Sequence, residues 1–230
     1  MAERIADAYG LVLFLILATF VVMMTLPPEG WGGRVAAVAI AVLTSVVAFT
    51  SSDVRPSRVR FAVVVAAAAV IAAVIAKVTD SDQVLGASFV AASLLLAIAA
   101  VTILFRVIRA VRVDFRTILG AVSVFALLGL LFAFFYFAFS HLSHRAFFDG
   151  VAQPRSSDYV FFSYTTLTTT GYGNLVPAGT VGQSVAVIEM LLGQIFLVTL
   201  VAGLVSLWRP GAAKASADQL MRREAGPGRG

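Results

Sequence analysis

The sequence predicts an all-α membrane protein with six transmembrane helices and one short re-entrant helix. Hydrophobic residues make up 60% of the 230 residues and charged residues only 13%, and the mean hydropathy of +0.96 is far above that of soluble domains. Six apolar runs are separated by short polar segments: Tyr9 to Leu26, Val35 to Phe49, Phe61 to Ala76, Val84 to Phe105, Ile118 to Phe139 and Val181 to Trp208. The second and third runs span a bilayer core, which requires about 20 residues, only if Arg34, Arg60 and Lys77 snorkel from their ends.

The composition excludes several other classes of protein. The chain contains no cysteine, so it has no disulfide framework, thiolate metal site or cysteine nucleophile. Its net charge of +5 comes from basic residues in the short loops, where they report membrane orientation rather than binding to nucleic acid. No Ser, His or Asp has the setting of a catalytic nucleophile, so we expect neither an enzyme nor a cofactor. The first run lacks a small-residue cleavage site, and we expect it to be retained as a span.

The distribution of basic residues predicts the orientation of the chain. Of the 17 Lys and Arg residues, thirteen lie on the side of the N-terminus if six helices cross the membrane. Only Arg34, Lys77, Arg145 and Arg155 lie on the opposite side. Because cytoplasmic loops are enriched in Lys and Arg, both termini are predicted in the cytoplasm and the loop between the fifth and sixth runs outside.

That outer loop contains an unusual segment. Ser156, Ser157 and Asp158 are typical N-cap residues, and they predict a helix from Tyr159 to Leu167. The chain continues as Thr-Thr-Thr-Gly-Tyr-Gly-Asn over residues 168–174. Glycines at alternate positions allow backbone angles that point successive carbonyl oxygens toward one axis. A helix whose carbonyl end faces the same axis places partial negative charge there, which favours a cation.

From Ile118 onward the order of span, outer loop, short helix, Gly-Tyr-Gly and span resembles the pore module of the potassium-channel superfamily. This resemblance implies a homotetramer in which K⁺, as the permeant ion, is bound by backbone oxygens of a selectivity filter. The implied filter residues are Thr169, Thr170, Gly171, Tyr172 and Gly173. Backbone oxygens of the first four would bind the ion.

Several positions around the filter depart from the family pattern. Phe161 and Phe162 stand where the family often has tryptophans, whose indole N–H can brace the filter tyrosine; phenylalanine has no donor. Thr165 stands where some bacterial members carry a glutamate, so we expect Tyr172 to be held more loosely than usual, or by Thr165 and Thr166 instead. Asn174 replaces an aspartate at the outer mouth, which weakens the concentration of cations there.

The last run carries two residues that bear on the pore. Gly193 lies twenty residues after Gly173, where the family has a glycine hinge; a glycine that allows close helix packing is the alternative. Glu189, one turn earlier, is an expensive residue in a membrane span. We expect it to hydrogen-bond threonines of the short helix and support the filter, either as a structural brace or as a titrating gate element. The residues predicted to line an inner cavity share one helical face: Gln194, Leu197, Val201 and Val205.

The first four runs resemble a voltage-sensing domain in position only. Arg106, Arg109 and Arg112 are three residues apart, but they follow a run without charge, and charges at the interface move little through the field. We therefore predict a basic linker from Arg106 to Arg116 that contacts anionic lipid. His141 and His144 share a helical face at the outer end of the fifth run, where interfacial polar residues are favoured over a metal site or a pH sensor.

The chain thus divides into a four-helix transmembrane domain (1–116), a pore domain (117–208) and a cytoplasmic tail (209–230). The sequence favours a tetrameric potassium-selective channel that is not voltage-gated. A weakly selective cation channel stays open as an alternative, as do a subunit of a potassium transporter and a non-conducting membrane sensor.

Overall fold

The structure, a computed structural model, describes residues 2–25, 31–50, 56–109, 115–143 and 146–207. Within these ranges all the regular elements are helices, with one isolated β-bridge and no named strand, so the all-α prediction is confirmed. The helices are α1 (Ala2–Thr25), α2 (Trp31–Thr50), α3 (Pro56–Thr79), α4 (Asp82–Ile108), α5 (Phe115–Ser143), α6 (Ser156–Leu167) and α7 (Thr180–Leu207).

Five of the described helices are long and apolar enough to cross a membrane, namely α2, α3, α4, α5 and α7. The chain is therefore a multi-pass membrane protein. The apolar part of α1, Tyr9–Thr25, is shorter than these five. Helices α2 and α3, with 20 and 24 residues, exceed the apolar runs predicted for them because the polar ends that carry Arg34, Arg60 and Lys77 are also helical.

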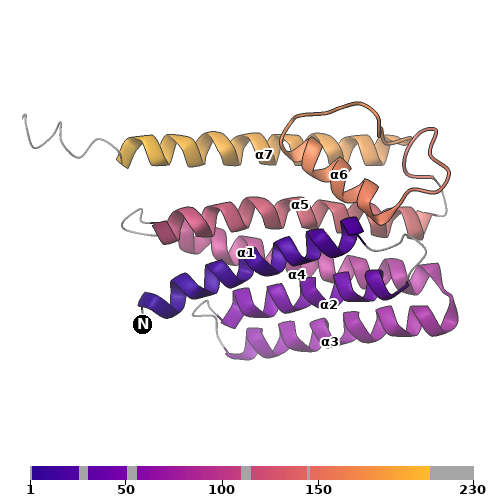
Figure 1. Ribbon diagram of the computed structural model, residues 1–230, viewed down its shortest axis with the longest axis horizontal. Coiled ribbons are helices and arrows are strands. Elements are labelled where there is room, and N and C mark those ends of the chain that lie inside the picture. The colour runs from indigo at the N-terminus through magenta and orange to yellow at the C-terminus, as the bar shows by residue number, and fades with distance from the viewer. Residues whose placement is uncertain (1, 26–30, 51–55, 110–114, 144–145, 208–230) are drawn as a thin grey trace, which may run out of the picture. The chain divides into compact units, whose positions relative to one another are not determined.

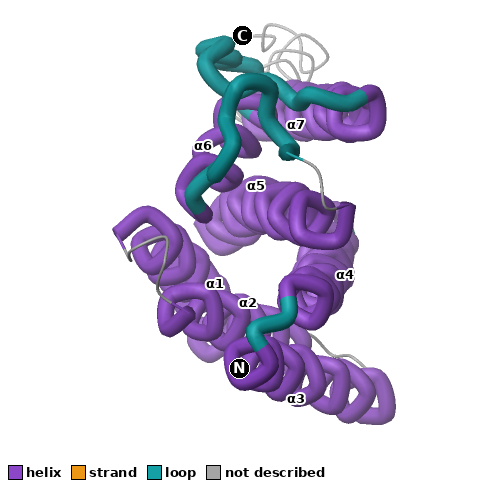
Figure 2. Tube along the Cα trace, turned by 90° about the vertical axis from the view of Figure 1, so that its right-hand side faces the viewer, coloured by secondary structure: helices purple, strands orange, loops and turns teal. Residues whose placement is uncertain are grey.

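Two of the first four helices, α1 and α4, pack on α5 of their own chain. Figure 2 shows α5 between the group α1–α4 and the short helix α6, and α4 packs along α5. The Phe89 ring of α4 lies 4.9 Å from that of Phe134 and 4.3 Å from that of Phe137. Gly86 allows a close approach, since a Cβ there would lie 2.9 Å from Cγ of Leu142. Every buried residue of α4 is uncharged, so the helix meets α5 through apolar and small side chains.

The predicted basic linker is only partly described, and its first part belongs to a helix. Helix α4 runs through Ile108, so Arg106 lies in its last turn and Arg109 is its C-cap. The Arg109 guanidinium lies 5.8 Å from the centre of the Phe105 ring. Arg112 lies outside the described residues, and Arg116 falls in the first turn of α5. The prediction that a separate segment begins at Arg106 is therefore wrong, because the apolar run of α4 extends the helix past it.

The chain divides into two compact units within α7. Residues Met1–Gln194 form the first, and Ile195–Gly230 form the second, whose described part continues the helix to Leu207. The predicted cytoplasmic tail, 209–230, lies outside the described residues.

Candidate functional site

Helix α6 is capped by the residue before it and by its own first turn. Arg155 has extended backbone angles, and its N–H donates to a carboxylate oxygen of Asp158 at 2.7 Å. The acidic Asp158 also lies at the positive end of the helix dipole. The helix begins at Ser156, three residues earlier than predicted, because Asp158 acts from inside the first turn rather than as the N-cap.

The back of α6 is attached to α5 at three levels. Three side chains of α6 donate hydrogen bonds to α5: Tyr159 Oη to Ser140 Oγ at 2.7 Å, Ser163 Oγ to the Gly129 carbonyl at 2.7 Å, and Tyr164 Oη to the Ala126 carbonyl at 2.8 Å. A Cβ at Gly129 would lie 2.6 Å from the Tyr164 ring, so only glycine allows this approach. The spacing of these bonds along both helices fixes the rotation and the height of α6 against α5.

An aromatic cluster fills the space behind the outer half of α6. Phe162 is buried, and its ring lies 5.2 Å from that of Tyr136 and 5.3 Å from that of Phe148. Phe147 contacts the same group, with ring distances of 5.1 Å to Tyr136 and 5.9 Å to Tyr159. Phe162 thus belongs to this back wall, and none of its described ring contacts is with Tyr172.

The segment after α6 has an alternating backbone. Thr169, Gly171 and Gly173 have φ of +57°, +51° and +76°, whereas Thr170 and Tyr172 between them do not have positive φ. Alternation of left- and right-handed residues turns successive carbonyl oxygens toward the same side of the chain. A β-branched residue such as Thr169 adopts positive φ at a cost of about 1–3 kcal/mol, which marks a functional constraint.

Hydrogen bonds hold the amide groups of this segment and leave its carbonyls free. The N–H groups of Thr170 and Gly171 both donate to the Thr165 carbonyl, at 2.8 and 3.1 Å, and Thr169 N–H donates to Thr166 at 2.9 Å. Within the part of the chain that the structure describes, no donor reaches the carbonyl oxygens of residues 168–173. A buried or pore-lining carbonyl requires a partner, and a cation can serve as one.

Tyr172, the tyrosine of the alternating segment, makes one described aromatic contact. The Tyr172 ring stacks on Phe161 with centroids 5.6 Å apart and planes at 20°, and the residue is 70% exposed. The Thr165 hydroxyl donates to the Phe162 carbonyl at 3.0 Å inside its own helix. The described contacts include no bond from Thr165 or Thr166 to this ring, because the helix backbone takes up the Thr165 hydroxyl, and a looser hold on Tyr172 stays a prediction. Asn174 is exposed beside it.

The loop between α5 and α6 is hydrogen-bonded to the chain just beyond this segment. Phe148 and Pro177 form the isolated antiparallel bridge, in which Asp149 N–H donates to the Val176 carbonyl and Ala178 N–H to the Phe147 carbonyl, both at 2.8 Å. Gln183 Nε2 of α7 also donates to the Pro177 carbonyl at 3.1 Å. Both ends of the alternating segment are thus tied to fixed elements.

The first part of α7 meets the rest of its unit along a narrow stripe. The buried residues there recur every three or four positions: Gly182, Ala186, Glu189 and Gly193. A Cβ at Gly193 would collide with the Leu167 carbonyl oxygen and lie 3.0 Å from Leu167 Cδ1. Gly193 therefore provides close packing against the end of α6, and a hinge role stays a prediction. Gln194 is exposed, and the cavity-lining roles of Gln194, Leu197 and Val201 stay predictions, while the Val205 side chain lies outside the described residues.

Glu189 is the one large residue of the stripe. It is 0% exposed, with Oε1 2.5 Å from Ser163 Oγ and Oε2 2.7 Å from Tyr136 Oη. The prediction that it binds threonines of α6 is wrong: the α6 face that turns toward both α5 and α7 carries Ser163, and the threonines lie nearer the carbonyl end.

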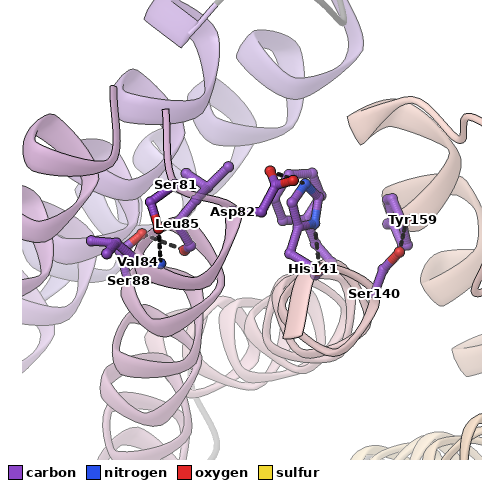
Figure 3. Close-up of polar contacts among 9 residues, drawn as sticks. Ser81, Asp82, Val84, Leu85, Ser88, Ser140, His141 and Tyr159 are labelled. Atoms are coloured by element: carbon purple, nitrogen blue, oxygen red, sulfur yellow. Dashed lines mark hydrogen bonds and ion pairs between the residues drawn. The ribbon is translucent and has the colours of Figure 1, made fainter. Parts of the chain in front are cut away.

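A second polar group lies at the outer ends of α4 and α5 (Figure 3). His141 Nδ1 is 2.9 Å from the Phe137 carbonyl, its ring stacks on Phe137 at 4.2 Å, and Nε2 is 3.9 Å from an oxygen of the exposed Asp82. His144 lies outside the described residues. Among the side chains that the structure describes, no three His, Asp or Glu residues gather into a metal site.

The comparison with known protein families agrees with this geometry. Residues 124–209 match the family model Ion_trans_2, described as an ion channel. The matched region begins in α5 and includes α6, the alternating segment and α7, so it supports an ion channel domain in this half of the chain. No curated protein and no solved structure matches the chain.

Sequence reasoning missed most of the residues that anchor α6. Tyr159 and Ser163 lie four apart on one helical face, and this spacing is a signal that could have paired them with a neighbouring helix. The three acceptors on α5 could not be found in this way, because two of them are the backbone carbonyls of Gly129 and Ala126. Gly129 and Tyr136 carried no local signal within a long apolar run.

Proposed function

We propose that the chain forms a homotetrameric channel that conducts K⁺ passively and selectively. The observation that carries the proposal is the alternating backbone at Thr169, Gly171 and Gly173, which leaves the carbonyl oxygens of the segment without protein donors. Rings of such oxygens replace the hydration shell of an ion that enters a narrow pore. The family match over 124–209 supports the ion-channel part of this proposal.

The tetramer follows from geometry and from unpartnered apolar surface. One chain supplies a single carbonyl ladder, which cannot surround an ion, whereas four copies around one axis can. The exposed ring of Tyr172 would then lie against a neighbouring copy. So would part of the apolar surface of α7, which includes the exposed residues Val187, Ile188, Leu191 and Leu192.

In this proposal α1 is the sixth span and both termini are cytoplasmic. Its 24 residues give a helix of about 36 Å, longer than the bilayer core of about 30 Å. Arg106, Arg109, Arg112 and Arg116 then face the inner leaflet and its anionic lipids. With no charge among the buried residues of α4, we expect a flat conductance–voltage relation.

A weakly selective cation channel is the second candidate. Tyr172 makes its only described ring contact with Phe161, which cannot donate a hydrogen bond, and Asn174 brings no charge to the outer mouth. A tyrosine held in this way constrains the diameter of the filter less tightly.

Ion flux into liposomes that contain the purified tetramer tests the proposal. We expect K⁺ uptake with little Na⁺ uptake, and loss of K⁺ uptake by at least tenfold in Gly171→Ala. Gly179→Ala is a matched control, because a Cβ at either glycine meets nothing within 4 Å and only Gly171 has positive φ. Within one chain, a difference between these variants therefore reports the backbone angle rather than a steric clash.

Each other outcome selects a different function. Equal K⁺ and Na⁺ flux would favour the weakly selective channel. No flux from a verified tetramer would favour a non-conducting sensor, and flux that requires a second protein would favour a transporter subunit.

A further inference from the structure

A carboxyl group is buried where the outer helix α5, the pore helix α6 and the inner helix α7 meet. Three short oxygen–oxygen contacts surround it: Tyr136 Oη to Glu189 Oε2 at 2.7 Å, Ser163 Oγ to Glu189 Oε1 at 2.5 Å, and Ser163 Oγ to the Gly129 carbonyl at 2.7 Å. In the described ranges no Lys, Arg or His side chain pairs with Glu189.

The number of hydrogens available to these three contacts bears on the protonation of the Glu189 carboxyl group. Each of the three contacts is of hydrogen-bond length and requires a hydrogen between the two oxygens. The hydroxyls of Tyr136 and Ser163 supply one each, and the Gly129 carbonyl supplies none. One hydroxyl hydrogen shared between two acceptors would lengthen both contacts, yet both contacts of Ser163 are short. A neutral carboxyl group would supply the third hydrogen, whereas an ionised carboxylate only accepts.

We propose that Glu189 is held as a neutral carboxylic acid whose proton completes a hydrogen-bond chain across three helices and so positions the filter. The carboxyl O–H donates to Ser163, the Ser163 O–H donates to the Gly129 carbonyl, and the Tyr136 O–H donates to the other carboxyl oxygen. Glu189 is a positioning residue that acts through Ser163. This inference rests on the proposed function for its link to conduction, but the protonation state can be tested without it.

The chain reaches the filter through one turn of α6. Ser163 lies two residues before Thr165, whose carbonyl accepts the N–H groups of Thr170 and Gly171. Gly193 of α7, one turn after Glu189, packs against Leu167 at the end of α6. Helix α7 therefore contacts α6 at two levels, and a shift of Ser163 is transmitted to the residue that holds the filter amides.

Loss of the proton would break this chain. A carboxylate would take the Ser163 hydrogen, which would remove the Ser163 bond to the Gly129 carbonyl between α6 and α5 and place an unpaired charge inside a membrane span. The titratable groups that face Glu189 are Tyr136 from α5 and Tyr164 from α6. Neither is a cation, so neither would compensate the new charge.

Two substitutions separate the proton from the shape of the side chain. Glu189→Gln keeps a donor for Ser163 and an acceptor for Tyr136, and it cannot ionise. Glu189→Leu has a similar volume and neither group. We expect the K⁺/Na⁺ flux ratio to be about three- to tenfold higher in Glu189→Gln than in Glu189→Leu, the range that follows from one or two intramembrane hydrogen bonds. Alkaline pH should reduce the ratio in the wild type and not in Glu189→Gln.

Infrared spectroscopy provides the readout that does not need conduction. The purified wild type at neutral pH should show the carbonyl stretch of a protonated carboxyl group, and Glu189→Gln should lack it. A wild-type spectrum without this band would overturn the inference even if the channel conducts K⁺, as would identical pH profiles for the wild type and Glu189→Gln. A protein that shows the band but no flux would instead contradict the proposed function. If Glu189→Leu does not fold, the band and the Glu189→Gln profile still decide the result.

Discussion

The two faces of the pore helix α6 are held in different ways. Its back face donates three hydrogen bonds to α5, contacts Glu189 of α7 and packs into the aromatic cluster. Its front face holds the alternating segment, the proposed filter, with the Thr165 carbonyl and a single described ring stack between Phe161 and Tyr172. The height of the filter is therefore fixed much more firmly than the position of its tyrosine ring.

This difference bears on the two phenylalanines, Phe161 and Phe162, that stand where the family resemblance led us to expect tryptophan. Phe161 and Phe162 are neighbours in the sequence, but one faces the filter and the other faces the cluster with Tyr136 and Phe148. Among the described contacts, no donor meets the Tyr172 ring, whereas three side chains donate hydrogen bonds from the opposite face of α6. Substitutions on the back face should therefore change the stability of the tetramer, and those on the front face should change selectivity.

The largest expected effect comes from Gly193→Ala, at the point where α7 packs against the end of α6. A Cβ at this position collides with the Leu167 carbonyl oxygen, and a backbone atom cannot move aside as a flexible side chain can. Overpacking of this kind costs about 1–3 kcal/mol or more. We expect the tetramer to dissociate at a clearly lower temperature in detergent and to lose K⁺ flux.

Gly179→Ala serves as its control, since a Cβ there meets nothing within 4 Å. The outcome also separates packing from the hinge that the family resemblance implies. A hinge role alone would change the open probability while the dissociation temperature stays that of the wild type. That result would show that the contact between Gly193 and Leu167 does not stabilise the position of α6.

A smaller effect is expected from the outermost hydrogen bond of the back face. Tyr159→Phe and Ser140→Ala each remove one partner of the 2.7 Å contact between α6 and α5. Hydrogen bonds between membrane helices contribute about 0.6 kcal/mol on average and up to about 1.7 kcal/mol. A double-mutant cycle on tetramer dissociation should give a coupling energy in this range with an unchanged K⁺/Na⁺ ratio. A change in the ratio without loss of stability would show that the two faces are not separable.

The fold was largely predictable because the helices of a membrane protein form long apolar runs in the sequence. Apart from Leu26 and Trp208, which lie outside the described residues, the apolar runs lie within the helices α1 to α5 and α7. Errors occurred where polar residues continue a helix, as at Arg106 and Ser156. Local sequence does not show how far such a helix continues, because contacts with a neighbour, here Val107 of α4 beside Gly120 of α5, also stabilise its last turn.

The candidate site was predictable where function depends on backbone geometry. Alternate glycines at Gly171 and Gly173 predict positive φ from a local pattern, and the structure has these angles. The partners of Glu189 were not predictable, because Ser163 and Tyr136 come from segments 26 and 53 residues away. Only the packing of three helices decides which hydroxyls a buried carboxyl group meets.

The smallest effect on stability, and the sharpest test of the front face, is expected from Phe161→Trp. The indole ring can keep the stack on Tyr172 and adds an N–H donor beside the tyrosine. Phe161 is only partly buried, so the larger ring requires little repacking. A net hydrogen bond of about 0.5–1.5 kcal/mol corresponds to a rise in the K⁺/Na⁺ flux ratio of roughly two- to tenfold. The tetramer dissociation temperature should stay within error of the wild type, with Phe162→Trp as the matched substitution that overpacks the back cluster and lowers it. If Phe161→Trp instead lowers the dissociation temperature and leaves the ratio unchanged, Phe161 belongs to the structural face, and the loose tyrosine does not limit selectivity.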